Sequence, residues 1–307
     1  MMGCMSGTFA CIEKKVLKDG RHVAYKTYSK SHGKLVYKHF KRELNICKQL
    51  QTKHPYHPNI LYLMDYQETS TNCILVFDCF EQSLQSLLDK KDPFLAHQCL
   101  NQIAKGLAYL HQYAIIHCDL SPSNILINLN SWHMVICDFG CAHTMDELID
   151  SSQEEIGTRL YKAPEHLFGN KQCSPSTDIW SLGAIFTQLL IGYPIFEGHS
   201  DIEQIARIVF RLGKPSEEIQ ETELSNCPDI HKLDFFTESE DEDEIEFDSE
   251  EEYVEFTSIR RPLSIVLEQE KLSSKDCTLI LGLLTWSMQE RQDNFLSIIN
   301  HHQTNSP

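Results

Sequence analysis

Short runs of alternating apolar and polar residues, separated by turns, open the chain. The alternation predicts β-strands with one buried face, and the continuous apolar run CILVF at residues 73–77 predicts a fully buried strand. Between these runs, residues 35–50 place Leu44 and Cys47 on one side at helical spacing. Residues 1–80 are therefore expected to form a small, strand-rich domain with one helix.

Beyond the first strands, the apolar spacing becomes helical. FLAHQCLNQIAKGLAYLHQY, residues 94–113, predicts a long amphipathic helix, and TDIWSLGAIFTQLLIG, residues 177–192, predicts another. Short strands are expected between them at ILI, residues 125–127, and at MVIC, residues 134–137. A strand-rich part followed by a larger helical part, residues 81–307, predicts an α+β fold with two lobes.

One acidic run interrupts the helical part at about residues 237–256. The stretch from Glu238 to Glu255 holds twelve acidic side chains and no basic one, and it accounts for most of the net charge of −17. Such a run cannot pack against itself, so we expect a disordered insertion. The negative charge also argues against a nucleic-acid partner or an anionic membrane surface.

The chain of 307 residues offers no apolar stretch of about 18 residues, so membrane insertion is not expected. The N-terminal segment MMGCMSGTFACIEKK resembles neither a signal peptide nor a myristoylation site. Twelve cysteines are scattered through apolar segments, without a CxxC pair or a Cys/His grouping at zinc-binding spacing. We interpret them as buried free thiols in a reducing compartment, which favours a cytoplasmic protein.

Five short motifs follow one another in a particular order. They are VAYK at 23–26, HCDLSPSN at 117–124, CDFG at 137–140, KAPE at 162–165 and DIWSLG at 178–183. Each motif alone is weak, but together they resemble the protein-kinase signature over roughly the whole chain. The resemblance implies a bilobal kinase fold, ATP and Mg²⁺ as cofactors, and a protein hydroxyl as acceptor.

The resemblance assigns a role to each of five catalytic positions. Lys26 would hold the α- and β-phosphates of ATP with Glu43 as its partner, and Asp119 would orient the substrate hydroxyl and accept its proton. Asp138 and Asn124 would bind Mg²⁺. The sequence alone leaves simpler interpretations open, in which Glu43 is an exposed helix charge, Asn124 caps a turn and Asp119 is a solvated loop acid.

Adenine binding needs an apolar slot and backbone hydrogen bonds. Ile12, Ala24 and Leu126 match the family positions that sandwich the ring, although ordinary core packing would also explain them. Phe77 takes the gatekeeper position. The hinge that would bond adenine through main-chain groups follows directly: Asp78, Cys79 and Phe80.

The glycine-rich loop of the family corresponds to MSGTFACI, which keeps only its middle glycine, Gly7. Met5 and Ala10 stand at the other two glycine positions and should weaken the approach of the backbone to the phosphates. In the catalytic loop, Cys118 and Ser121 replace two basic residues. Loss of one such charge typically costs about 10²–10³ in rate, so we expect attenuated catalysis. The alternative is a nucleotide-binding pseudokinase that acts as a scaffold.

The segments GTRLYKAPE and DIEQIARIVFRLGKP resemble the cyclin-dependent-kinase branch, and most of all the cell-cycle-related kinases. This implies a monomeric serine/threonine kinase with a role in cilium formation or the cell cycle, located in the cytoplasm, nucleus or cilium. The helix around Glu43 lacks the cyclin-binding signature, so a cyclin partner stays open. The resemblance also implies that Glu165 of KAPE pairs with Arg291 as a structural ion pair.

Kinases of this branch hold an activating phosphothreonine with three arginines. Here Cys118 and His143 replace two of them, and Arg42 remains. Gln153 falls on the phosphothreonine position. We therefore expect an activation segment that needs no phosphate, with a phosphosite shifted to the neighbouring serines as the alternative: Ser151 and Ser152.

Overall fold

The computed structural model describes residues 5–6, 10–145, 147, 157–236 and 260–303. Backbone contacts divide the chain into two compact units. The first unit comprises Met1–Asp89, His97–Gly157 and Gln172–Ser174, and the second unit comprises Lys90–Ala96, Thr158–Lys171 and Pro175–Pro307. Each unit is described by itself, and the domain boundary expected between residues 80 and 81 stays a prediction.

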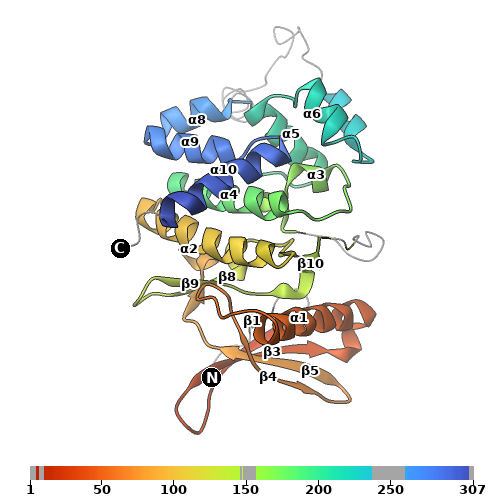
Figure 1. Cartoon of the computed structure of the whole chain (residues 1–307), viewed down its shortest axis with the longest axis vertical. Coiled ribbons are helices and arrows are strands. Elements are labelled where there is room, and N and C mark those ends of the chain that lie inside the picture. Colours follow the sequence, from red (N-terminus) through yellow and green to blue (C-terminus); the bar gives the residue numbers. More distant parts are fainter. Residues whose placement is uncertain (1–4, 7–9, 146, 148–156, 237–259, 304–307) are drawn as a thin grey trace, which may run out of the picture. The chain divides into compact units, whose positions relative to one another are not determined.

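A five-stranded antiparallel sheet forms the N-terminal part of the first unit (Figure 1). Its strands, in spatial order, are β1 (Met5–Ser6), β2 (Cys11–Val16), β3 (His22–Ser29), β5 (Asn72–Asp78) and β4 (Leu63–Glu68). The central strand β3 pairs with both β2 and β5 along its length. Its backbone is therefore hydrogen-bonded to a neighbour on both sides, which makes β3 a rigid carrier for a functional residue.

The helix α1 (Lys34–Thr52) packs beside this sheet. It begins after Gly33, whose φ of 96° is a conformation that favours glycine. Its buried positions recur at helical spacing and include Phe40, Leu44 and Cys47. Glu43 lies on the same buried face, so α1 carries one carboxylate into the interior.

Smaller elements of the first unit follow. A three-stranded sheet contains β6 (Gln82–Ser83), β8 (Ile125–Asn128) and β9 (His133–Ile136), and a two-stranded sheet contains β7 (Ile115–Ile116) and β10 (His143–Thr144). The long helix α2 (Pro93–Gln112) precedes β7, and it belongs to the first unit from His97 onward. Short 3₁₀ helices lie between the strands and at their ends: η1 (Lys30–His32), η2 (Leu84–Leu87), η3 (Pro122–Asn124) and η4 (Phe139–Cys141).

The second unit is helical. Its helices are α3 (Pro164–Leu167), α4 (Pro175–Ile191), α5 (Asp201–Leu212), α6 (Glu217–Thr222), α8 (Leu263–Gln269), α9 (Ser274–Leu283) and α10 (Met288–Gln303), with 3₁₀ helices η5 (Arg159–Tyr161) and η6 (Ile230–Phe235). Almost every residue of α4 is buried, because α9 and α10 pack against it (Figure 1). The sheet of the first unit and these helices confirm the α+β class.

Among the described residues, ten cysteines are free, and seven of these are buried. This agrees with the expectation of buried thiols, except that Cys11 is disulfide-bonded. None of the helices in the described ranges is long and apolar enough to cross a membrane. The acidic run expected to be a disordered insertion lies outside the described residues.

Candidate active site

The site begins with an ion pair between β3 and α1. The Lys26 ammonium lies 3.0 Å from the Glu43 carboxylate, and both side chains are buried. The hydroxyl of Tyr28 donates a hydrogen bond to the same carboxylate. Glu43 is only 1% exposed, so the interpretation of this residue as a solvated helix charge is wrong.

Asp138 completes a triad with this pair. It follows β9 in the left-handed conformation, with a φ of 64°, and its Oδ1 lies 2.8 Å from the Lys26 ammonium. The backbone N–H of Gly140 donates to the same oxygen at 3.2 Å. The ring Nδ1 of His39, on α1, lies 3.0 Å from the Gly140 carbonyl and so ties the helix to this segment.

Burial and charge oppose each other within the triad. Burial lowers the pKa of Lys26, but the Asp138 and Glu43 carboxylates outweigh it and hold that pKa well above its usual value. Burial raises the pKa of Glu43, and the neighbouring Lys26 offsets this only in part. At Asp138 burial also raises the pKa, but the charge and hydrogen bond of Lys26 prevail and lower it. Lys26 and Asp138 are therefore both charged at neutral pH.

The loop between β7 and β8 contributes a second polar group. The amide nitrogen of Asn124 donates to the main-chain oxygen of Asp119 at 2.8 Å and to its carboxylate at 3.2 Å. The ring of His117 is buried, and its Nε2 donates to the Cys137 carbonyl at 2.9 Å while its Nδ1 accepts from the Asp119 N–H at 3.3 Å. These bonds hold the Asp119 loop against the strand that leads to Asp138.

The residues expected at the adenine slot, with the gatekeeper position, lie on four strands. Ala24 on β3 lies opposite Phe77 on β5, whose side chain is buried. Ile12 on β2 is exposed and Leu126 on β8 is half-buried. Of the hinge residues, Asp78 is exposed and Phe80 is half-buried. Gly7, the remaining loop glycine, lies outside the described residues.

Lys14 is a feature that the sequence analysis missed. Its ammonium donates to the main-chain oxygens of Phe80 at 2.9 Å and Glu81 at 2.6 Å, which links β2 to the hinge. Tyr28 and His39 were also missed, although a signal exists for both. Tyr28 lies two residues after Lys26 on the same strand face, and His39 lies one helical turn before Glu43.

The two catalytic-loop positions at which the family has basic residues, 118 and 121, are buried here. Ser121 is 2% exposed and occupies the position of the missing lysine, before η3. Cys118 is buried and adopts a φ of 64°. Arg42, the arginine expected to hold a phosphate, lies 3.5 Å from the carboxylate of Glu147. Arg42 is therefore paired with a carboxylate of the segment after Asp138.

An ion pair in the second unit matches the expectation. Arg291 on α10 makes two contacts with the Glu165 carboxylate, at 2.8 and 3.2 Å, and both side chains are fully buried. The guanidinium also donates to the Ser176 carbonyl at 3.0 Å and lies over the Trp180 ring. The predicted structural pair is confirmed.

A comparison with protein-family models identifies the family of the chain. The model of the protein kinase domain matches residues 3–302, which is nearly the whole chain. The sheet, the Lys26–Glu43–Asp138 triad and the Asp119–Asn124 loop fit that match. The chain therefore belongs to the protein kinase domain family.

Proposed function

We propose that the protein is an ATP-dependent protein kinase that phosphorylates serine or threonine hydroxyls at an attenuated rate. The observation that carries this proposal is the assembled triad, in which Lys26 touches Glu43 and Asp138 at once. A buried lysine between two carboxylates has no packing purpose that a hydrophobic residue would not serve as well. Its value lies in presenting a fixed positive charge to phosphate oxygens.

The donor set fits Mg-ATP. Asp138 and Asn124 offer a carboxylate and an amide oxygen, the hard ligands that Mg²⁺ prefers. When bound, Mg-ATP supplies the phosphoryl group and the metal charge that offsets charge on the phosphates. Lys26 would orient the phosphates. Asp119, held by Asn124 at 3.2 Å, would accept the proton of the attacking hydroxyl.

The attenuation follows from the catalytic loop. Ser121 provides no charge where the family has a lysine, and a serine cannot stabilise developing phosphoryl charge as a cation does. The same observation supports a second candidate function, a nucleotide-binding pseudokinase scaffold. In that case the triad would serve nucleotide binding and stability alone.

Resemblance to the cyclin-dependent-kinase branch supports finer proposals. They are a monomeric enzyme with a protein substrate, a role in cilium formation or the cell cycle, and a cytoplasmic, nuclear or ciliary location. Of the cyclin-binding signature, α1 carries only Arg42, so the proposal includes no cyclin partner.

One experiment separates the two candidates. Purified protein, in excess over the nucleotide, is mixed with Mg-ATP. Single-turnover transfer to a peptide or to the protein itself is then followed by mass spectrometry. Thermal stability is measured with and without Mg-ATP, because a ligand that binds the native state raises its melting temperature. A kinase shows both transfer and a shift, whereas a scaffold shows the shift alone.

The variants make the assignment specific. Asp119→Asn should abolish transfer and keep the thermal shift, whereas Lys26→Met and Asp138→Asn should reduce both. Asp89→Asn, an exposed acid on the surface of the first unit, is the matched control and should behave as the wild type. Transfer that persists in Asp119→Asn, or a wild type without a shift at millimolar Mg-ATP, would refute the proposed roles.

A further inference from the structure

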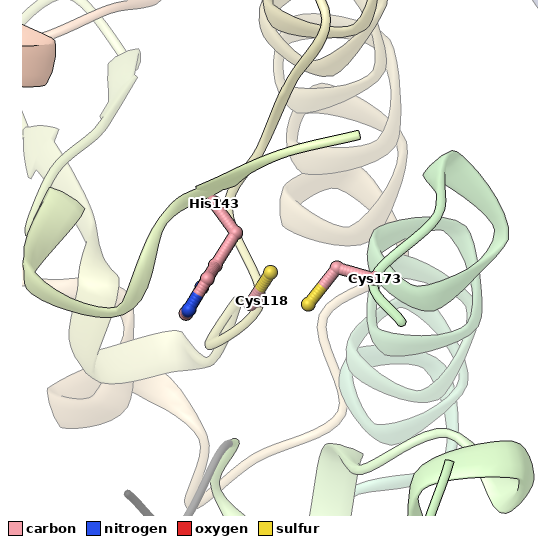
Figure 2. A group of neighbouring side chains, drawn as sticks. All are labelled: Cys118, His143 and Cys173. Carbon is pink, nitrogen blue, oxygen red and sulfur yellow. The ribbon is translucent and has the colours of Figure 1, made fainter. Parts of the chain in front are cut away.

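Three buried side chains of the first unit, none of them part of the triad, meet in one place (Figure 2). They are Cys118, His143 and Cys173, which are 3%, 1% and 2% exposed. One ligand atom from each, the two sulfurs and a ring nitrogen, lies within 4.8 Å of the others. The sequence showed no zinc-binding spacing, because the three residues come from distant positions of the chain.

The fold explains why they meet. Cys118 lies two residues after the end of β7, and His143 opens β10 directly opposite Ile116 of β7. Cys173 belongs to the short segment that joins the first unit just before α4. Ile116 packs with both cysteines in one buried cluster, which closes the cluster to water on the apolar side.

The histidine ring is already oriented by a second contact. Its Nδ1 lies 2.7 Å from the Cys141 carbonyl, and a carbonyl can only accept. Nδ1 therefore carries the proton, and the lone pair of the neutral ring is on Nε2. A metal-binding histidine commonly donates its other ring N–H to a carbonyl in this way, because the bond fixes the tautomer and the ring orientation.

We propose that Cys118, His143 and Cys173 bind a zinc ion. Two sulfurs and an imidazole form a soft donor set that selects Zn²⁺ over Mg²⁺ or Ca²⁺, and three protein ligands with water in the fourth position make a complete tetrahedral site. Binding releases one proton from each cysteine thiol, so two thiolates balance the two charges of the ion. A buried ion is thereby left without net charge.

The required movement is small. Tetrahedral zinc with Zn–S bonds of about 2.3 Å brings its two sulfurs to about 3.7 Å apart. Ligand atoms within 4.8 Å of one another reach this arrangement when side-chain rotation brings them about an ångström closer together. The thiol of Cys118 donates to the Ile116 carbonyl at 3.5 Å, and it would exchange this weak bond for the metal.

The location gives the site a purpose. Cys118 directly precedes Asp119, and Cys118 and His143 occupy the two positions at which the resemblance leads us to expect phosphate-holding arginines. A zinc ion would join the Asp119 loop, β10 and the 172–174 segment, as a phosphate would join the arginines. The zinc proposal does not rest on the proposed kinase activity. Metal content and activity are measured separately, so one can fail without the other.

The test measures the metal directly. Protein is purified without chelator, loaded with zinc, and passed through a desalting column before elemental analysis. The expected result is about one zinc per chain for the wild type and well below that for Cys118→Ser and Cys173→Ser. Cys277→Ser, a partly exposed cysteine on α9, is the matched control and should retain the metal.

Three further measurements guard against misfolded variants. His143→Cys supplies another zinc ligand and should retain the metal, whereas His143→Ala should lose it. In the wild type, Co²⁺ should give a thiolate-to-cobalt absorption band that zinc abolishes. Chelation of zinc should lower the melting temperature of the wild type but not of Cys118→Ser.

Three results would overturn the proposal. One is a wild type that binds no zinc or cobalt, and another is zinc that remains bound in both cysteine variants. The third is an intact mass lighter by two hydrogens together with a Cys118–Cys173 peptide, because a disulfide would then account for the pair.

Discussion

Ser121 illustrates at the scale of one residue how a small substitution changes the chemistry of a site. It lies two positions after Asp119 and is buried. Its neutral hydroxyl therefore does not replace the positive charge of the lysine that the family has at this position. The surrounding loop is otherwise ordered by Asn124 and His117. The expected defect is therefore one of electrostatics and not of loop structure.

Ser121→Lys should raise the single-turnover rate of phosphoryl transfer by about tenfold or more, because it restores a cation where charge develops. The affinity for ATP should change less than the rate. Ser86→Lys, an exposed serine in η2, serves as the control for added charge. An unchanged or slower Ser121→Lys would mean that another group already fills this role.

The Glu165–Arg291 pair provides a test by pH. Burial raises the pKa of Glu165, but the guanidinium of Arg291 outweighs it, so the pKa of the folded state lies below the unfolded value. A depressed pKa stabilises the fold above the unfolded pKa of about 4.3, and this contribution disappears as the pH falls through the folded value.

Arg291→Met should destabilise the protein by about 3–5 kcal/mol at pH 7, because it leaves a buried carboxylate without its partner. Glu165 then becomes protonated more easily, so the deficit relative to the wild type should shrink between pH 7 and pH 5. Urea unfolding at both pH values measures it. Arg21→Met breaks an exposed pair with Asp19 and should change the stability much less, because water screens that pair; an equal cost would contradict the argument.

At the scale of elements, α1 connects the site to the segment after Asp138. One face of the helix buries Glu43 and His39, and the neighbouring Arg42 contacts Glu147. A carboxylate cannot be removed by a phosphatase. The contact therefore supports the prediction of a segment set without phosphorylation, although Gln153 and the two serines beside it lie outside the described residues.

Phosphatase treatment should leave the activity unchanged, and so should the double variant Ser151→Ala/Ser152→Ala. Glu147→Gln should lower activity several-fold, because it removes the charge that Arg42 contacts. A loss of about tenfold or more after phosphatase treatment, equivalent to one or two kcal/mol of ordering, would show a phosphate switch instead.

Packing between α4 and α9 is close at Gly183. A methyl group built there would lie 2.8 Å from Leu283 Cβ and 3.1 Å from Leu284 Cδ2. Gly183→Ala should therefore destabilise the protein by about 1–3 kcal/mol, although alanine favours helix formation. In urea unfolding, Gly183→Ala/Leu284→Ala removes the Cδ2 atom at this contact and should cost less than the sum of its single variants, and simple additivity would contradict the close contact.

The whole molecule carries a charge of −17, and twelve acidic residues fall between Glu238 and Glu255. These residues lie outside those that the structure describes. Their composition makes them poor core formers, so we expect them to serve a partner or solubility and not catalysis.

Deletion of residues 238–255 should leave peptide phosphorylation within about twofold of the wild type and should lower solubility at low ionic strength. Single-turnover kinetics and precipitation assays measure the two effects. A large loss of activity, or a melting temperature lowered by many degrees, would show that the run packs against the helical part.

The sequence predicted the regular elements closely. The helix expected at 35–50 is α1, that at 94–113 is α2 within one residue at each end, and the strand at 73–77 is β5. These succeed because apolar periodicity is a local property of the chain. Lys14 escaped prediction because its partners, the hinge oxygens, are main-chain atoms that any residue could supply.

The sequence by itself determined the family, because the spacing of the motifs around Lys26, Asp119 and Asp138 is a one-dimensional pattern. It also marked Cys118 and Ser121 as departures. Only the tertiary structure decided that Glu43 is buried against Lys26, and that Cys118, His143 and Cys173 meet. The physical reason is that a soft-metal donor set depends on distances in space, and these arise when β10 pairs with β7 and the 172–174 segment packs beside them.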